Sequence, residues 1–161
     1  MEKFQELREI AKKKVQLADH MLSVTYPLVK EPKLLVSIME NTFLAYINAM
    51  GSLLYYERLF TKIPKFEDTF NSKLEMFKDK CLEKHKIDKI YVNDMTELKT
   101  LLLEHKKSTA EFTRKDKFVI CSDNFSCKTI SAIEMQRYIN RAKLFIQYIT
   151  AITSKNEGLF R

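Results

Sequence analysis

The feature that most constrains the fold is a run of sixteen residues without a formal charge, NTFLAYINAMGSLLYY, at positions 41–56. Charged residues make up 30% of the chain, so this run predicts a helix that is enclosed on almost every side. Apolar residues recur at helical spacing elsewhere, and the chain has only two Gly and three Pro. We therefore predict an all-α fold, an up-and-down bundle of about five helices around a long central helix, as a single domain over residues 1–161.

Proline positions and capping patterns set the expected helix boundaries. Pro27 is expected to end the first helix. The pairs Asp94/Glu97 and Ser131/Glu134 have the spacing of a capping box, which marks the start of a helix. The expected helices span residues 4–25, 32–60, 67–85, 95–107 and 131–154.

The segment 117–130 departs from the helical pattern. The runs FVIC at 118–121 and CKTI at 127–130 are rich in β-branched or aromatic residues, and turn-forming residues separate them. Because the Asn-Gly turn signal is lacking, an extended loop and a hairpin fit the pattern equally well. We therefore expect a short extended or hairpin segment here.

Composition and motif spacing argue against several functional classes. Cys81, Cys121 and Cys127 lack the paired spacing of zinc and redox sites, so we expect three reduced thiols in a cytoplasmic protein. The three histidines are isolated, and two glycines cannot form a phosphate-binding loop. The uncharged run is shorter than the ~20 residues that a membrane span needs. We expect no metal, no cofactor, no membrane span and no catalytic residues.

Much of the positive charge lies in the last third of the chain. The net charge is +7, and cations outnumber acids within residues 106–143. Phe112, Phe118 and Phe125 alternate with these cations, a pattern that suits single-stranded RNA. Lysines that only solvate helix faces are the alternative. The expected phosphate contacts are Lys106, Lys107, Arg114, Lys115, Lys117, Arg137 and Arg141.

Two of these cations have a competing interpretation. Arg137 and Arg141 fall at the border of the buried face of the last helix. Arginines at such a border commonly lay their stems along the core and pair with a carboxylate. A structural role is therefore favoured slightly over phosphate binding for both.

A stripe of small residues on the central helix predicts a close helix–helix contact. Asn41, Ala45, Asn48 and Ser52 fall within about 40° of one another on a helical wheel. Either a helix of the same chain or a second copy of the chain fills this seam. Four partner helices barely cover a rod of roughly 42 Å, so we expect a homodimer with these residues at the interface.

The long central helix NTFLAYINAMGSLLYYERL, between a first helix that contains Ala and Lys and later amphipathic helices, resembles the HEPN superfamily of small helical bundles over residues 4–110. The resemblance implies a dimeric bundle associated with RNA cleavage, toxin–antitoxin systems or nucleotidyltransferase partners. Active RNases of that family carry an Arg followed four to six residues later by His, and no Arg of this chain has such a His. The resemblance therefore implies a member without nuclease activity.

The leading hypothesis is a cytoplasmic, dimeric binding module whose partner is RNA or a protein–RNA assembly. A protein–protein adaptor or antitoxin-like subunit, whose charge only keeps it in solution, is the alternative. An enzyme is less favoured. It would need a ligand-sized cavity beside the central helix, near Asn41, Asn48 and Tyr55.

Overall fold

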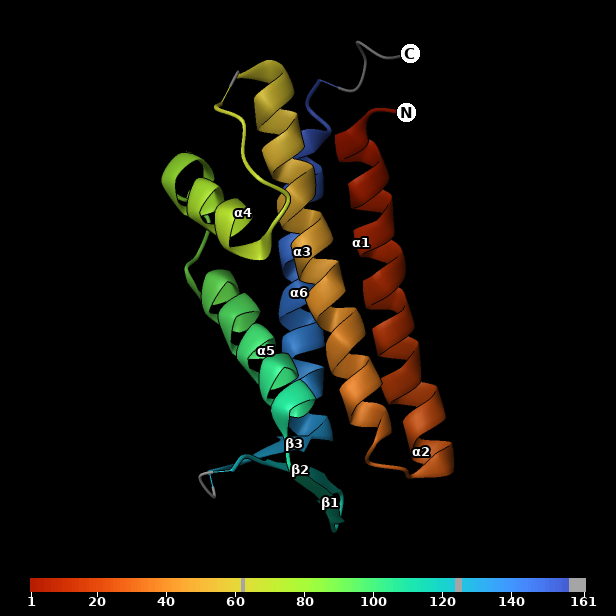
Figure 1. Cartoon of the computed structure of the whole chain (residues 1–161). Helices are drawn as coiled ribbons and strands as arrows, with labels where there is room; N and C mark the ends of the chain where they lie inside the picture. Colours follow the sequence, from red (N-terminus) through yellow and green to blue (C-terminus); the bar gives the residue numbers. More distant parts are fainter. Residues whose placement is uncertain (62, 124–125, 157–161) are drawn as a thin grey trace.

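The computed structural model describes residues 1–61, 63–123 and 126–156, and it is mainly helical. A long helix, α3, lies in the middle of the molecule (Figure 1). The expected bundle around a central helix is confirmed. The main helices are α1 (Lys3–His20), α3 (Leu34–Phe60), α4 (Phe70–Phe77), α5 (Ile90–Lys107) and α6 (Ala132–Thr153).

The central helix is enclosed as the uncharged run predicts. Tyr46, Met50 and Leu53 are fully buried among residues of the neighbouring helices. The buried hydroxyls also have acceptors, since Thr42 donates to the Ile38 carbonyl at 2.8 Å and Ser52 donates to a carbonyl of α1 at 2.6 Å. No helix in the described part of the chain is long and apolar enough to cross a membrane.

The first helix does not end at Pro27. A π-helical segment, η1 (Met21–Thr25), follows α1, and a short helix, α2 (Tyr26–Val29), continues the path. Pro27 is the second residue of α2 and has no N–H to donate to the preceding helical turn, yet the helical path continues through it. The helical path ends only at Lys30, which has a left-handed backbone with φ of 48°.

The helix expected at 67–85 corresponds to α4 followed by a π-helical segment, η2 (Lys78–Leu82).

The start of the helix expected at 95–107 was predicted wrongly. Asp94 does not begin a helix, because α5 already starts at Ile90, whose N–H donates to the Asp88 carboxylate at 2.9 Å. Capping-box spacing is also the spacing of neighbours on one helix face, so the pattern alone does not distinguish the two cases.

The second capping prediction is confirmed. The Ser131 hydroxyl accepts a hydrogen bond from the Glu134 N–H at 3.3 Å, and α6 begins at Ala132. Ser131 is also the last residue of a strand, so the chain passes directly from a sheet into α6. The sheet is therefore joined to the bundle at this residue.

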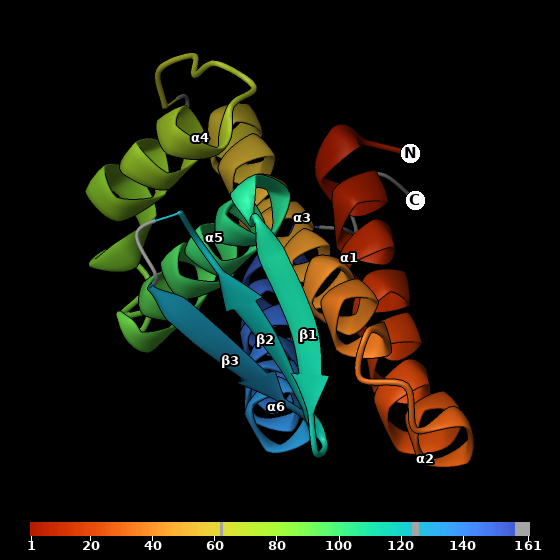
Figure 2. The ribbon, with the colours of Figure 1, turned by 60° about the horizontal axis from the view of Figure 1, so that its bottom comes forward.

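The segment after α5 forms a three-stranded antiparallel sheet in the order β1-β2-β3. Figure 2 shows this sheet across one end of the bundle. The predicted hairpin corresponds to β2 and β3, whereas β1 was missed because all of its residues are exposed and lack apolar alternation. The strands are β1 (Ala110–Arg114), β2 (Lys117–Cys121) and β3 (Cys127–Ser131).

The cysteines depart from the expectation of three reduced thiols. Cys121 and Cys127 lie directly opposite each other in the register of β2 and β3 and form a disulfide. Only the register of the sheet brings them together, which their spacing in the sequence does not reveal. Cys81 is a buried free thiol, and burial, followed by the neighbouring Glu57 carboxylate, raises its pKa to about 12.

Candidate functional site

The sheet has two faces of different character. Alternate residues of a strand point to opposite faces. Phe118, Ile120 and Ile130 are buried and belong to the face that covers the bundle. The opposite face, which we call the outer face, consists of Ala110, Phe112, Arg114, Lys117, Val119, Cys121, Cys127, Thr129 and Ser131.

An aromatic ring lies on the outer face beside two cations. Phe112 is 48% exposed and pairs in register with Val119. Arg114 follows two residues later on the same strand and is opposite Lys117. An exposed ring next to cations offers a stacking surface for a base and contacts for its phosphate. Of the other predicted aromatics, Phe118 is buried and unavailable, and Phe125 lies outside the described residues.

The predicted loop cations lie at both ends of β1. Lys106 and Lys107 end α5, whereas Arg114, Lys115 and Lys117 surround the β1–β2 turn. All five are exposed, and within residues 1–61, 63–123 and 126–156 none of them is in an ion pair. They therefore form a track along the strand rather than one cluster.

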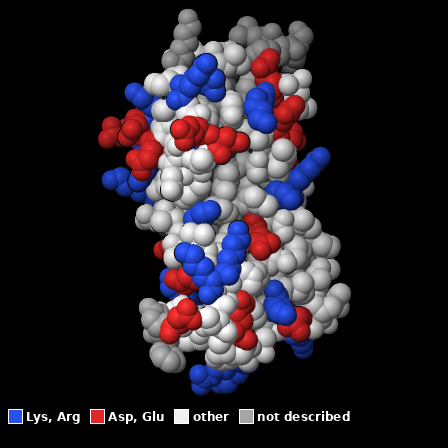
Figure 3. All heavy atoms as spheres, viewed as in Figure 1, with Lys and Arg blue, Asp and Glu red and all other residues white. Residues whose placement is uncertain are grey.

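Cations elsewhere in the molecule more often have acidic partners. Lys128 pairs with Glu104 at 2.9 Å, and Lys143 pairs with Asp19 at 2.8 Å. Figure 3 shows acidic and basic side chains interspersed over the helices, with basic side chains at the lower end, where Figure 1 places the sheet. Among the described residues, the cations of the β1 track thus differ from Lys128 on β3 and Lys143 on α6 in having no carboxylate partner.

Arg141 has a structural partner, as one of the two interpretations anticipated. It forms an ion pair with the buried Asp94 at 2.9 Å, so we leave it out of the candidate site. Arg137 is exposed and lies over the ring of Tyr138, 5.4 Å from its centroid. The structure therefore separates the two arginines that the sequence grouped together.

Asp94 connects three helices. Its carboxylate accepts hydrogen bonds from Tyr46 of α3 at 3.0 Å and from Arg141 of α6 at 2.9 Å. Burial raises the pKa of Asp94, although these two bonds oppose the shift. Burial and the Asp94 carboxylate also raise the pKa of the Tyr46 hydroxyl. This cluster was missed because its members come from distant parts of the sequence.

A second buried carboxylate, that of Glu57, lies near the C-terminal end of α3. Glu57 is 1% exposed and accepts hydrogen bonds from Lys84 at 2.7 Å and from Thr61 at 2.6 Å, and it also contacts the His85 ring. Burial alone would raise the pKa of Glu57, but the hydrogen bonds from these side chains outweigh it and lower the pKa. The carboxylate is fully engaged, which fits a structural role.

The small-residue stripe of α3 faces α1 of the same chain. Ala45 and Ser52 are completely buried, and Ser52 donates its hydrogen bond to the Phe4 carbonyl. Asn41 and Asn48 are partly exposed, and each donates to a carbonyl one turn earlier in α3, at 2.9 and 2.7 Å. A helix of the same chain thus covers the centre of the seam, while the two asparagines lie at its edge.

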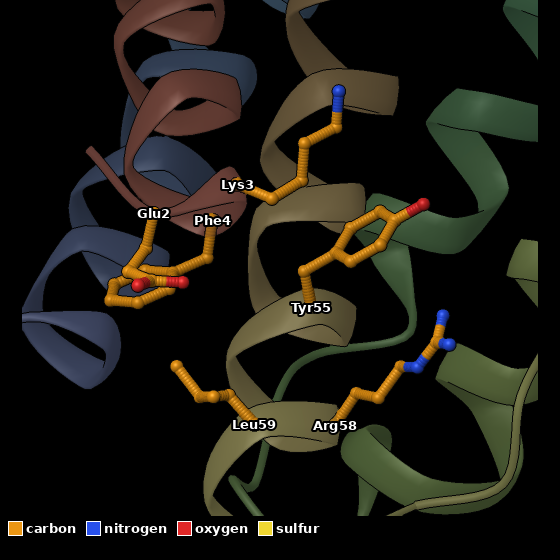
Figure 4. A pocket seen from close by; sticks show the side chains of 6 residues that line it. All are labelled: Glu2, Lys3, Phe4, Tyr55, Arg58 and Leu59. Carbon is orange, nitrogen blue, oxygen red and sulfur yellow. The ribbon is translucent and has the colours of Figure 1, made fainter.

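A hollow of about 270 Å³ lies beside the end of α3. Figure 4 shows side chains of α3 next to the beginning of α1. Of the three residues expected around an enzyme's cavity, Tyr55 lines this hollow, whereas Asn41 and Asn48 do not. Arg58 lies over the Phe66 ring, 5.8 Å from its centroid, and Glu2 takes part in the capping box of α1. The lining residues are Glu2, Lys3, Phe4, Tyr55, Arg58 and Leu59.

A larger hollow, of about 500 Å³, lies between α1 and α6. Val15 and Ile146 contribute apolar surface to it, and Lys12 and Lys143 are its cations. Both lysines already pair with carboxylates. Among the described residues, no group of three His, Cys, Asp or Glu side chains is placed to hold a metal ion.

Comparison with known proteins adds no homologue. No protein-family model matches the chain, and no curated protein is significantly similar to it. Function is therefore inferred from the geometry and charge of the sheet. The outer face with the β1 track is the strongest candidate, because it combines an exposed ring with unpaired cations.

Proposed function

We propose that the protein binds single-stranded RNA, alone or within a protein–RNA assembly, without catalysing a reaction. The observation that carries the proposal is the exposed Phe112 on the outer face, with the five unpaired cations of the β1 track on both sides of it along the chain. The net charge of +7 adds a long-range attraction for a polyanion.

Each part of this surface has a chemical role. Lysine and arginine side chains neutralise backbone phosphates and release condensed counterions, which makes the affinity fall as salt rises. The Phe112 ring offers a face on which any base can stack, so the expected binding depends little on sequence. Arg114 adds a planar guanidinium that can donate two parallel hydrogen bonds to one phosphate.

The test is the anisotropy of a fluorescent, unstructured RNA of mixed sequence, titrated with protein from low to physiological salt. We expect a steep loss of affinity with salt. Reversing the charge of Lys106, Lys107, Arg114, Lys115 and Lys117 together should abolish binding, while circular dichroism stays unchanged. Phe112→Ala should weaken binding about tenfold, within the range measured for loss of base stacking. Wild-type protein that does not bind at low salt would disprove the proposal.

The protein–protein adaptor remains the competing hypothesis. It predicts that affinity-purified protein carries one stoichiometric protein partner and no nucleic acid. The RNA hypothesis predicts RNase-sensitive material with strong absorbance at 260 nm. The chain has no Trp, so its own absorbance is low and bound nucleic acid is easily detected.

We also propose that the protein self-associates, as its resemblance to the dimeric HEPN bundles implies. The partly exposed Asn41 and Asn48 would be the accessible part of a dimer interface. Equilibrium sedimentation at micromolar concentration tests this, and a single species of 19.1 kDa would exclude the homodimer.

The proposed location is cytoplasmic, where RNA partners are abundant. The Cys121–Cys127 disulfide is instead typical of oxidising compartments. Alkylation of free thiols in intact cells, followed by mass measurement of the protein, distinguishes the two. Three alkylated cysteines are expected for a reduced cytoplasmic protein, and one, at Cys81, for the bridged form.

A further inference from the structure

A hydrogen bond links the β1–β2 turn to α2. The Tyr26 hydroxyl of α2 donates to the Asp116 carbonyl at 3.3 Å. The Tyr26 ring is partly buried and packs against the core, so the contact holds the turn next to α2. Figures 1 and 2 both show α2 and the tip of the sheet at the same end of the bundle.

This attachment brings two more lysines to the end of the β1 track. Lys30 follows Tyr26 by one turn, and its N–H donates to the Tyr26 carbonyl at 2.8 Å. Lys33 lies just before α3. Both are exposed, and neither forms an ion pair within the described ranges 1–61, 63–123 and 126–156. They therefore have the same character as the cations of the sheet.

The cations of the β1–β2 and α2–α3 turns outnumber the acids of these turns. The two turns and the residues next to them carry two carboxylates, those of Asp116 and Glu31, and five exposed cations. The Glu31 carboxylate also accepts a hydrogen bond from the Lys33 N–H at 3.3 Å. The cations at this end of the molecule are Lys30, Lys33, Arg114, Lys115 and Lys117.

The backbone at both turns is unusual. Lys30 and Lys115 have left-handed conformations, with φ of 48° and 57°, which glycine adopts more easily than lysine. Lys86 shares this conformation elsewhere in the chain, with φ of 53°, so the conformation alone does not mark a binding site.

We infer that the RNA track continues from the β1–β2 turn onto the α2–α3 turn, where Lys30 and Lys33 form a second phosphate-binding subsite. This inference rests on the proposed RNA binding. It assigns protein contacts to the part of the RNA that extends beyond the sheet. An RNA long enough to reach both turns uses both subsites, and a short RNA uses only the sheet. The ligand class is therefore an extended single strand.

The decisive variant is the double substitution Lys30→Gln and Lys33→Gln. Its matched control is Lys65→Gln with Lys80→Gln, which removes two exposed lysines from regions outside the track. For an RNA of about 15 nucleotides, we expect the first variant to bind about tenfold more weakly than wild type. Its log–log salt slope should be smaller by about 1.4, the value for two phosphates of a single strand. The control should change neither quantity beyond the effect of net charge at low salt.

RNA length and the attachment of the turn provide independent readouts. For an RNA of about 4 nucleotides, near the lower limit of reported site sizes, we expect the Lys30/Lys33 variant to bind as wild type does. Tyr26→Phe keeps the ring and removes the hydroxyl, and it should weaken binding of the long RNA severalfold and leave the short one unchanged. Equal losses in the Lys30/Lys33 variant and its control, or equal losses for long and short RNA, would overturn the inference.

Failure of the inference is distinguishable from failure of the proposed function. If wild-type protein does not bind RNA at low salt, both fall. If wild type binds, and charge reversal on the β1 track abolishes binding while the Lys30/Lys33 variant matches its control, only the second subsite is disproved. If the Lys30/Lys33 variant no longer binds long RNA more tightly than short RNA, and its salt slope is smaller than that of wild type, both the second subsite and the proposed function are supported.

Discussion

The bundle and the sheet use charged side chains in opposite ways. Inside the bundle, Asp94 and Glu57 are almost completely buried, and cations and hydroxyls satisfy both carboxylates. On the β1 track, exposed cations have no carboxylate partner among the described residues. The same residue types therefore fix the architecture in one region and stay available for a ligand in the other.

The two buried carboxylates also differ from each other. Glu57 contacts three side chains, Lys84, Thr61 and His85, and its pKa is lowered despite burial. Asp94 has two partners, Tyr46 and Arg141, and burial prevails, so its pKa is raised. The sign of each shift thus follows the balance between burial and the hydrogen bonds and charges around the acid.

The comparison predicts that bundle variants change stability, whereas sheet variants change binding. Asp94→Ala should have the largest effect on folding, a loss of about 3 kcal/mol in the free energy of unfolding, because it leaves Arg141 and the Tyr46 hydroxyl without their partner. Urea denaturation measures this loss. RNA affinity of the folded variant should equal that of wild type, and a loss below about 1 kcal/mol would show that the cluster is not structural.

Glu57→Gln should have the next largest effect, about 2 kcal/mol at neutral pH, because a neutral amide replaces the acceptor of Lys84 and His85. The lowered pKa of Glu57 means that the unfolded chain takes up a proton first as the pH falls. Its stabilisation is therefore complete above the ordinary glutamate pKa and is lost as the pH falls through the lowered value.

The measurement for Glu57 is the free energy of unfolding as a function of pH in the acid range. The Gln variant should show a flatter acid limb than wild type. Asp94→Asn serves as the contrasting variant, because the raised pKa of Asp94 gives its contribution the opposite sign, lost as the pH rises through the raised value. Curves of the same shape for wild type and Glu57→Gln would contradict the assignment.

Lys115→Gly should change stability and RNA affinity in opposite directions. Glycine relieves the left-handed backbone and should stabilise the protein by about 1 kcal/mol, while loss of the cation should weaken RNA binding. Lys86→Gly is the matched control, since it has the same backbone conformation away from the track. It should gain similar stability with unchanged affinity. A loss of stability in both variants would show that the left-handed turns are not strained.

The smallest expected effect is that of Gly51→Ala in α3. Alanine favours a helix over glycine by about 1 kcal/mol. The new methyl group would lie 3.2 Å from Cδ1 of Leu7, a partly exposed side chain of α1 that can move slightly. We expect a net gain of about 0.5 kcal/mol and unchanged RNA affinity. Thermal denaturation tests the sign, and a destabilised variant would show that the α1–α3 seam is more rigid than we infer.

Local patterns predicted the elements whose signal lies within a few residues. The uncharged run led to α3, and the Ser131/Glu134 pair led to the beginning of α6. The strand β1 has no such signal, because an exposed edge strand needs no apolar alternation. Its existence depends on hydrogen bonds to β2, which a propensity argument does not include.

The candidate site was predicted only in part. The structure places Lys106, Lys107, Arg114, Lys115 and Lys117 at the surface, and their role as phosphate contacts stays a prediction. The border position of Arg141 favoured a structural role, but its partner Asp94, forty-seven residues away, could not be named from the sequence. Lys30 and Lys33 had no signal, because their neighbours in space follow them by more than eighty residues.

The sequence by itself determined an enclosed helix, the helices around it and a strongly basic character, because periodicity and net charge are properties of neighbouring residues or of the whole composition. The tertiary structure alone decided which charges are neutralised, which cysteines meet, and that Tyr26 lies against the Asp116 carbonyl. Pairing of this kind depends on distances between residues far apart in the chain, and only the packed bundle fixes those distances.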